Sequence, residues 1–465
     1  MKKILTGLLA ASVMLGSLAA CNSKLDVQPI DNVDAEQALN NSSDVQAALV
    51  GAYTGLQDVN AYGGNVQFFS DLLANNGEYA FLGTFAEPKE AQNKSLLKDN
   101  FTVANMWLRG YSTINRVNNV LANVGKLDTP AKQASGEGEA RFIRALVYFD
   151  LVRLYAKAWN DGSPQTNLGV PLVLTPTLGI SASSSVPRST VAEVYAQIIA
   201  DLTTATGPTT ALTKLPATNG FFATRGAALA LLARVYLQQG RFADAADAAN
   251  RVITSTSPTY RLNTNYADNF VSNNDLLPNT NEDIFAIQIS AQSGINQLNT
   301  FYARTRRGDI RIRPQLLAQF ETGDDRRALF NSTATNTYSS KYNVLYGGIK
   351  LIRFAEMYLI RAEGNLRSGV AQVGTNTPLV DVNVIRSRAK LPPLTAVVLA
   401  DVLKERRLEL AFEGFRLGDL KRNQESTIDP VSTAAIAWNS PRLVLPIPLR
   451  EINANPNLVQ NEGYQ

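Results

Sequence analysis

AALALLARVYLQQGRFADAADAANRVI, residues Ala227–Ile253, decides the fold of this chain. Apolar residues recur at helical spacing on both sides of Gln239-Gly240, so the stretch predicts two helices joined by a tight turn. Small residues at Ala233 and Ala245 allow the helices to pack closely. Tyr236 and Phe242 are large enough to fill the groove around the turn.

The spacing within this helix pair is that of a tetratricopeptide repeat. The residues that fit it are Leu232, Ala233, Tyr236, Gly240, Phe242 and Ala245. Ala249 stands where such a repeat carries an aromatic residue, so an ordinary helical hairpin remains the alternative. We take residues 225–253 as the clearest repeat and Phe354–Arg388 as a looser second one. Because such units cover one another's apolar faces, we expect further degenerate units in the chain.

Other segments extend this helical pattern. Apolar residues at helical spacing predict helices over Ala35–Ala61, Met106–Val124 and Gly138–Ala156. The third has apolar residues on more than one face, so we expect it to be buried. Asp161–Val186 is rich in Pro, Thr, Ser and Gly and predicts an ordered loop, and Asn263–Asn299 predicts loops around a short strand at 284–289.

The first 21 residues have the pattern of an export signal. Lys2 and Lys3 precede an apolar run that ends in Leu18-Ala19-Ala20-Cys21, and Cys21 is the single cysteine of the chain. This ending resembles a bacterial lipoprotein lipobox, a resemblance that implies cleavage before Cys21 and acylation of its thiol. We therefore predict a signal peptide over 1–20, a polar tether over 21–32 and one domain over 33–465. A plain signal peptide or a transmembrane helix with an incidental cysteine is the alternative.

Composition favours a binding protein over an enzyme. Hydrophobic residues make up 45% of the chain, enough for a sizeable core. Without Lys2 and Lys3, 42 basic residues face 40 acidic ones, a net charge of +2 that gives no case for nucleic acid. The chain has no histidine, which excludes Ser-His-Asp triads and HExxH zinc sites. We expect no catalysis, metal or cofactor.

LKERRLELAFEGFRLGDLKRN, Leu403–Asn423, places three carboxylates at intervals of four residues. Glu405, Glu409 and Glu413 would share one face if the helix continued through all of them. Two carboxylates on one face do not bracket a scissile bond, so we predict buried ion pairs rather than catalysis. The candidate partners are Arg353, Arg386 and Arg416.

The order of motifs along the chain resembles the SusD/RagB family of outer-membrane nutrient-binding lipoproteins. The motifs that carry the resemblance are YSTINRVNNVL (Tyr111–Leu121), the Gly138–Ala156 helix with GVPLV (Gly169–Val173), Arg225–Ile253, RFAEMYLIRAEGNLRSG (Arg353–Gly369), DVNVIRSRA (Asp381–Ala389), Leu403–Asn423 and LPIPLREINANPNLVQNEGY (Leu445–Tyr464).

This resemblance implies a mainly α-helical domain. Tetratricopeptide-like helix pairs would form a right-handed superhelical scaffold, and loops with a few short strands would form the ligand face. It also implies a lipid-anchored protein facing outward from the outer membrane. Its partners would be a TonB-dependent, SusC-like transporter and a nutrient oligomer, most often an oligosaccharide.

A protein that binds a sugar without catalysis needs exposed aromatic rings flanked by polar groups. We expect these rings in loops, because aromatic residues on helices usually belong to the core. Two clusters fit, Asn75–Phe85 and Phe301–Arg307. The candidate ligand contacts are Asn76, Tyr79, Phe81, Phe85, Phe301, Tyr302 and Arg304. For each ring, burial under a loop is the competing interpretation. Trp159 and Trp438 are outlying candidates, and we expect Trp107 in the core.

The sequence leaves alternatives open for the arginine cluster and for the function of the protein. The five arginines within 304–313 could hold an acidic ligand, or they could pair with Asp309, Glu321, Asp324 and Asp325. The chain could be a repeat scaffold for protein assembly or a peptide-binding member of the same family. A surface glycosidase would need two carboxylates, with Asp71, Glu78 and Glu87 as candidates.

Overall fold

The computed structural model describes residues 39–179, 181, 184–203, 211–217 and 222–464. The predicted signal peptide (1–20), tether (21–32) and Cys21 lie outside the described residues. So do residues 33–38, at the start of the predicted domain.

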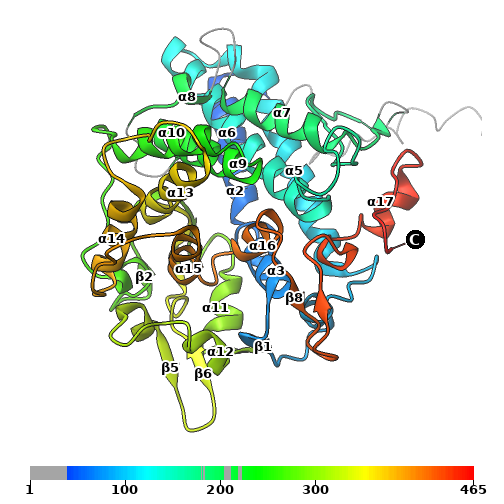
Figure 1. Cartoon of the computed structure of the whole chain (residues 1–465). Coiled ribbons are helices and arrows are strands. Elements are labelled where there is room, and N and C mark those ends of the chain that lie inside the picture. Colours follow the sequence, from blue (N-terminus) through cyan, green and yellow to red (C-terminus); the bar gives the residue numbers. More distant parts are fainter. Residues whose placement is uncertain (1–38, 180, 182–183, 204–210, 218–221, 465) are drawn as a thin grey trace, which may run out of the picture.

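Long helices form the scaffold and pack in succession along the chain. The scaffold helices are α2 (Ser42–Gln57), α5 (Phe101–Asn123), α6 (Pro130–Tyr155), α7 (Val191–Leu202), α9 (Arg225–Gln238), α10 (Phe242–Ile253), α13 (Phe354–Arg367), α14 (Pro378–Arg388) and α15 (Leu399–Glu409). In Figure 1, α5, α6, α7, α9 and α10 lie in the upper part of the molecule, and α14 and α15 lie lower.

Shorter elements complete the fold. The short α-helices are α3 (Asn65–Ala74), α4 (Ala86–Asn93), α8 (Ala211–Lys214), α11 (Gln297–Tyr302), α12 (Pro314–Leu317), α16 (Arg416–Arg422) and α17 (Leu449–Ala454). The 3-10 helices are η1 (Val124–Lys126), η3 (Tyr266–Asn269), η4 (Asp325–Leu329) and η5 (Pro441–Leu443). Among the described residues, no helix is both long and apolar enough to cross a membrane.

The strands form three small sheets. One has the order β1-β4-β6-β5, a second β2-β7-β3, and the third pairs β8 with β9. Their bounds are β1 (Tyr79–Phe81), β2 (Leu276–Leu277), β3 (Asp283–Ile289), β4 (Ile310–Ile312), β5 (Phe330–Ser332), β6 (Thr337–Ser339), β7 (Tyr346–Arg353), β8 (Thr427–Ile428) and β9 (Ala435–Ile436). In Figure 1, β1, β5, β6, α11 and α12 lie at the lower end of the molecule. The mainly helical fold with few short strands is thus confirmed.

The predicted repeat is the pair α9 and α10. Gly240 supplies the turn with φ +71°, and Ala233 and Ala245 are fully buried between the helices. α10 also packs against α13, where Gly364 permits the approach, since a Cβ there would lie 2.6 Å from the Phe242 carbonyl oxygen. The second predicted helix pair, Phe354–Arg388, is present as α13 and α14, and it packs next to α10.

Helix ends follow their capping residues. α2 begins at Ser42 rather than at the predicted Ala35, because the Asn41 side chain accepts from the backbone N–H of Ser43 and Asp44. It ends at Gln57, before a turn that the sequence pattern had included in the helix. α6 starts earlier than predicted, at Pro130, whose missing N–H is tolerated in the first turn of a helix.

Three of the quoted motifs meet around one buried arginine. Arg144 on α6 donates to Asp201 Oδ2 at 2.8 Å and to Asn118 Oδ1 at 2.9 Å. Asn118 on α5 in turn donates to the carbonyl oxygen of Val173 at 2.9 Å, and the Tyr148 hydroxyl accepts from the Val173 N–H at 2.7 Å. These contacts hold the GVPLV segment of the predicted loop against the scaffold.

Candidate functional site

The two sequence clusters chosen as ligand contacts lie side by side. β1 pairs with β4 in antiparallel register, with Phe81 opposite Ile310. The Leu82 N–H then donates to the Asp309 carbonyl oxygen at 2.8 Å. The sequence predicted both clusters but not their contact, because the strands that join them are only three residues long.

The exposed part of this junction is named here the Phe85 surface. It consists of the exposed residues Leu82, Thr84, Phe85, Arg304, Arg306 and Arg307. The Phe85 ring is 44% exposed, and its edge meets Phe301 with ring centroids 6.3 Å apart. The guanidinium carbon of Arg307 lies 4.2 Å from the Phe85 ring centroid, a cation–π contact. The surface therefore combines one accessible ring with several hydrogen-bond donors.

Arg307 is fixed by two further contacts. Its Nε lies 2.7 Å from Asp309 Oδ2, and its Nη2 donates to Thr84 Oγ1 at 3.3 Å. Asp309 thus neutralises part of the arginine cluster, as one of the two sequence interpretations expected. Arg311 stacks over Tyr338 at 4.4 Å, and this half-buried tyrosine on β6 carried no signal in the sequence.

The other three acidic residues considered for the cluster pair elsewhere. Glu321 contacts Arg386, Asp324 contacts Arg326, and Asp325 contacts Lys390. The exposed arginines at 304 and 306 therefore keep their positive charge at the Phe85 surface.

Four candidate contacts are buried rather than exposed. Tyr79, Phe81, Phe301 and Tyr302 belong to the hydrophobic core, and Tyr302 is fully inaccessible. Phe301 stacks on Phe68 of α3 at 4.3 Å. This burial removes the four rings from the candidate platform, because neighbouring side chains occupy the space that a sugar would need.

The tryptophans lie in or against the core. Trp107 is buried on α5, as predicted. Trp159 and Trp438 are half-buried and pack on the main core, and Trp159 meets Tyr195 edge-on at 5.1 Å. Of the candidate contacts, Asn76 is half-buried while Phe85 and Arg304 are exposed, and their ligand contact stays a prediction.

Two of the three carboxylates considered for glycoside hydrolysis, Asp71 and Glu78, are tied to the interior, whereas Glu87 lies half-buried in the first turn of α4. Asp71 Oδ2 accepts from the Gly414 N–H at 3.2 Å, and burial raises the pKa of Asp71 from 3.8 to about 8. Glu78 pairs with Arg407 and accepts from Gln319 Nε2 at 2.6 Å. These two groups hold secondary structure together and do not face each other across the Phe85 surface.

The predicted ion pairs form a buried network. Arg353 lies 2.8 Å from Glu409 and 2.7 Å from Glu413, and Arg386 lies 2.9 Å from Glu405. The helix itself was predicted too long. α15 ends at Glu409, because Phe412 and Gly414 adopt φ +66° and +81°, so Glu413 reaches Arg353 from a turn. Arg416 pairs with Glu425.

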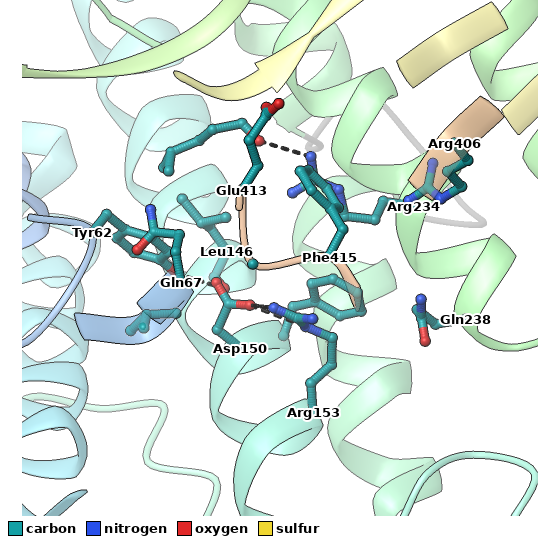
Figure 2. A pocket seen from close by; sticks show the side chains of 14 residues that line it. Tyr62, Gln67, Leu146, Asp150, Arg153, Arg234, Gln238, Arg406, Glu413 and Phe415 are labelled. Carbon is teal, nitrogen blue, oxygen red and sulfur yellow. Dashed lines mark hydrogen bonds and ion pairs between the residues drawn. The ribbon is translucent and has the colours of Figure 1, made fainter. Parts of the chain in front are cut away.

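A polar cavity lies behind this turn (Figure 2). Asp150 and Arg153 pair on one side of it, and Phe415 separates them from Arg234 and Arg406. Within the described part of the chain, the Gln67 amide has no hydrogen-bond partner. The cavity has a volume of about 30 Å³, which suits one or two waters and excludes a sugar ring. Among the described residues, no group of acidic side chains could hold a metal ion.

Comparisons with known proteins agree with the motif order. The family model described as starch-binding associating with outer membrane matches residues 25–237, and the model of the SusD family matches residues 322–441. The chain belongs to the SusD family. The SusD-like protein P2 of Formosa agariphila is 27% identical over 97% of this chain and 98% of its own.

Other members of the family agree in sequence or fold. The starch-binding protein SusD of Bacteroides thetaiotaomicron is 33% identical over 129 residues, which are 25% of this chain and 22% of that protein. The crystal structure of a SusD superfamily protein from Bacteroides thetaiotaomicron has 25% identity and a TM-score of 0.77, covering 91% of this chain and 100% of that one. Surface glycan-binding protein A of Bacteroides uniformis shares the fold, with 23% identity and a TM-score of 0.74, over 91% of this chain and 100% of its own.

Proposed function

We propose that this protein is a cell-surface lipoprotein that captures a nutrient oligomer and delivers it to a TonB-dependent, SusC-like transporter. The oligomer that we propose is an oligosaccharide. Acylated Cys21 would anchor the protein to the outer membrane, facing the cell exterior. Membership of a family described as starch-binding and associating with the outer membrane supports oligosaccharide capture and the location at the outer membrane. The protein would bind without cutting, because Asp71 and Glu78, two of the three carboxylates considered for hydrolysis, are held in interior contacts.

The Phe85 surface carries the proposal. A sugar ring has an apolar face that packs on an aromatic ring, and its hydroxyl groups need donors and acceptors around that ring. Phe85 offers the accessible ring, while Thr84, Arg304 and Arg307 offer the polar groups. Asn76, half-buried in the turn between α3 and β1, is the further proposed contact. One observation leads us to propose the Phe85 surface as the ligand site. The exposed Phe85 ring lies beside Arg307, whose guanidinium carbon is 4.2 Å from the ring centroid.

The test compares two exposed phenylalanines. Purified lipoprotein in detergent is screened against neutral and acidic oligosaccharides, and the best ligand is then titrated by calorimetry. Phe85→Ala should weaken binding by about 10- to 150-fold, since a buried Phe contributes about 1.5–3 kcal/mol. Phe101→Ala is the matched control, because Phe101 is 69% exposed at the start of α5. It should leave the affinity unchanged.

Two outcomes would overturn this assignment. Equal affinities in Phe85→Ala and Phe101→Ala would show that the ligand binds elsewhere. Binding of peptides but of no oligosaccharide would favour a peptide-binding member of the family. A repeat scaffold for protein assembly would bind neither class of ligand.

A further inference from the structure

A second cleft opens between the scaffold and the edge of the β2-β7-β3 sheet. It has a volume of about 330 Å³, within the range of about 300–1,000 Å³ of small-molecule pockets. Its walls come from the start of α9, from the segment that follows α10 and from β3 with the turn before it. It shares no lining residue with the Phe85 surface or with the cavity of Figure 2.

Amides, hydroxyls and aromatic rings line the cleft. The residues used in the argument are Tyr260, Asn279, Thr280, Asn281, Asp283 and Phe285. Asn279 and Asn281 are exposed at the rim, whereas Tyr260 and Phe285 are buried beneath them. The two buried rings shape the bottom of the cleft, and the amides at its rim can meet the hydroxyl groups of a sugar ring.

The aromatic floor is held in place by its neighbours. The Tyr260 hydroxyl lies 3.1 Å from Thr224 Oγ1, and its ring lies 6.0 Å from Phe354. Gly226 leaves the space for that hydroxyl, since a Cβ at this position would lie 2.3 Å from it. Phe285 meets Phe142 of α6 edge-on at 4.9 Å. These contacts give the cleft a pre-formed shape, which lowers the entropy cost of binding.

The polar groups of the cleft carry no net charge. Asp283 is the single charged residue among the described lining residues, and its Oδ2 accepts from Lys350 Nζ at 2.6 Å and from the Thr280 N–H at 2.7 Å. Its Oδ1 is buried and has no hydrogen-bond partner within the described part of the chain. Lys350 therefore neutralises Asp283, which offers no free charge to a ligand in the cleft.

The side-chain amides at the rim are partly hydrogen-bonded to neighbouring residues. The Asn279 oxygen accepts from Gln288 Nε2 at 3.1 Å, and its NH₂ group donates no hydrogen bond to the residues that the structure describes. With its amide group turned by 180°, the orientation that its neighbours favour, the Asn281 oxygen accepts from Arg261 Nη2 at 2.8 Å and Nε at 3.1 Å. Asn279 therefore holds its oxygen in place and keeps its NH₂ group as a donor for hydroxyl oxygens, while Asn281 adds a second amide at the rim.

We propose that this cleft is a second ligand site that binds one neutral, hydroxyl-rich sugar unit. A neutral ligand is favoured because the charge among the described lining residues is already paired, and a wholly apolar ligand would leave the rim amides without partners. The site stands on its own geometry and does not depend on capture of an oligomer at the Phe85 surface.

The test uses the whole purified protein and single sugars as probes. Ligand-observed NMR titrations with D-glucose, D-galactose and D-xylose measure the affinity, with D-glucuronate as the charged comparator. The double variant Asn279→Ala with Asn281→Ala should weaken binding of the best probe by about 5- to 150-fold, as expected for two lost hydrogen bonds. The matched control is Asn273→Ala with Asn274→Ala, a pair of exposed asparagines that do not line the cleft.

The parallel variant Phe85→Ala distinguishes this site from the Phe85 surface. Retained monosaccharide affinity in Phe85→Ala, together with the loss in the cleft variant, would support the second site. The proposal is overturned if none of the three neutral sugars binds, if both double variants bind equally, if glucuronate binds more tightly than the neutral sugars, or if Phe85→Ala alone abolishes binding. An unchanged unfolding midpoint in each variant excludes misfolding as the cause.

Discussion

Gly414→Ala is expected to destabilise the protein by about 2–5 kcal/mol. Gly414 has φ +81°, and forcing an L-residue into the left-handed region costs about 1–2 kcal/mol. A Cβ would also lie 2.7 Å from Gln67 Cα on α3, a backbone atom that cannot rotate away. Relieving that overlap adds about 1–3 kcal/mol, the usual cost of overpacking. It would also strain the hydrogen bond from Ser70 Oγ to the Gly414 carbonyl oxygen.

Two control glycines separate these contributions. Gly323 has φ +86° but no atom near the added Cβ, so Gly323→Ala isolates the backbone cost of about 1–2 kcal/mol. Gly51 lies within α2 with nothing within 4 Å of the added Cβ, so Gly51→Ala should stabilise the protein by about 0.5–1 kcal/mol.

Urea unfolding is followed by circular dichroism and fitted with a shared m-value. It gives the change in the free energy of unfolding of each variant relative to the wild type. The expected order of stability is Gly51→Ala, wild type, Gly323→Ala, then Gly414→Ala. If Gly414→Ala costs no more than Gly323→Ala, close packing of this turn against α3 is not the reason for the glycine.

Three further predictions concern buried charge. Arg353→Met should cost about 3–5 kcal/mol in urea unfolding at pH 7, because it leaves Glu282, Glu409 and Glu413 buried without their shared partner; a cost below 1 kcal/mol would contradict the network. Burial alone would raise the pKa of Glu409, but the guanidinium groups around it hold that pKa at about 2. Its contribution is therefore present above pH 4.5 and lost as the pH falls towards 2, and Glu409→Gln should flatten this part of the stability profile. Burial raises the pKa of Asp71 to about 8, so stability should fall as the pH rises from about 4 to 8, and Asp71→Asn should raise the urea midpoint at pH 8; an unchanged midpoint would refute the ionisation cost.

The sequence predicted the scaffold better than the site, for a physical reason. α9 and α10 are long enough to show helical periodicity, and Gly240 marks the turn between them, so their bounds follow closely from the pattern. The α15 helix was extended too far because periodicity continues through Glu413, while the backbone reverses at Phe412 and Gly414. The charge pairing was nevertheless predicted, since a buried carboxylate needs a cation whatever the backbone does.

At the candidate site, periodicity gives no guidance. α11 has six residues and β1 has three, too short for a pattern to separate inner from outer faces. Phe301 and Phe85 are therefore equal candidates in sequence, although the structure buries the first and exposes the second. The contact between Arg307 and Thr84 spans 223 positions in the chain, and only the folded structure reveals it.

Co-purification from the outer membrane tests the central claim, uptake of a captured oligomer, most directly. The lipoprotein with a C-terminal tag is captured from membranes solubilised in mild detergent, and the proteins that accompany it are identified by mass spectrometry. The proposed function predicts a stoichiometric TonB-dependent barrel in the eluate. Recovery of the lipoprotein alone, or with periplasmic assembly factors, would contradict the uptake role and favour the scaffold interpretation.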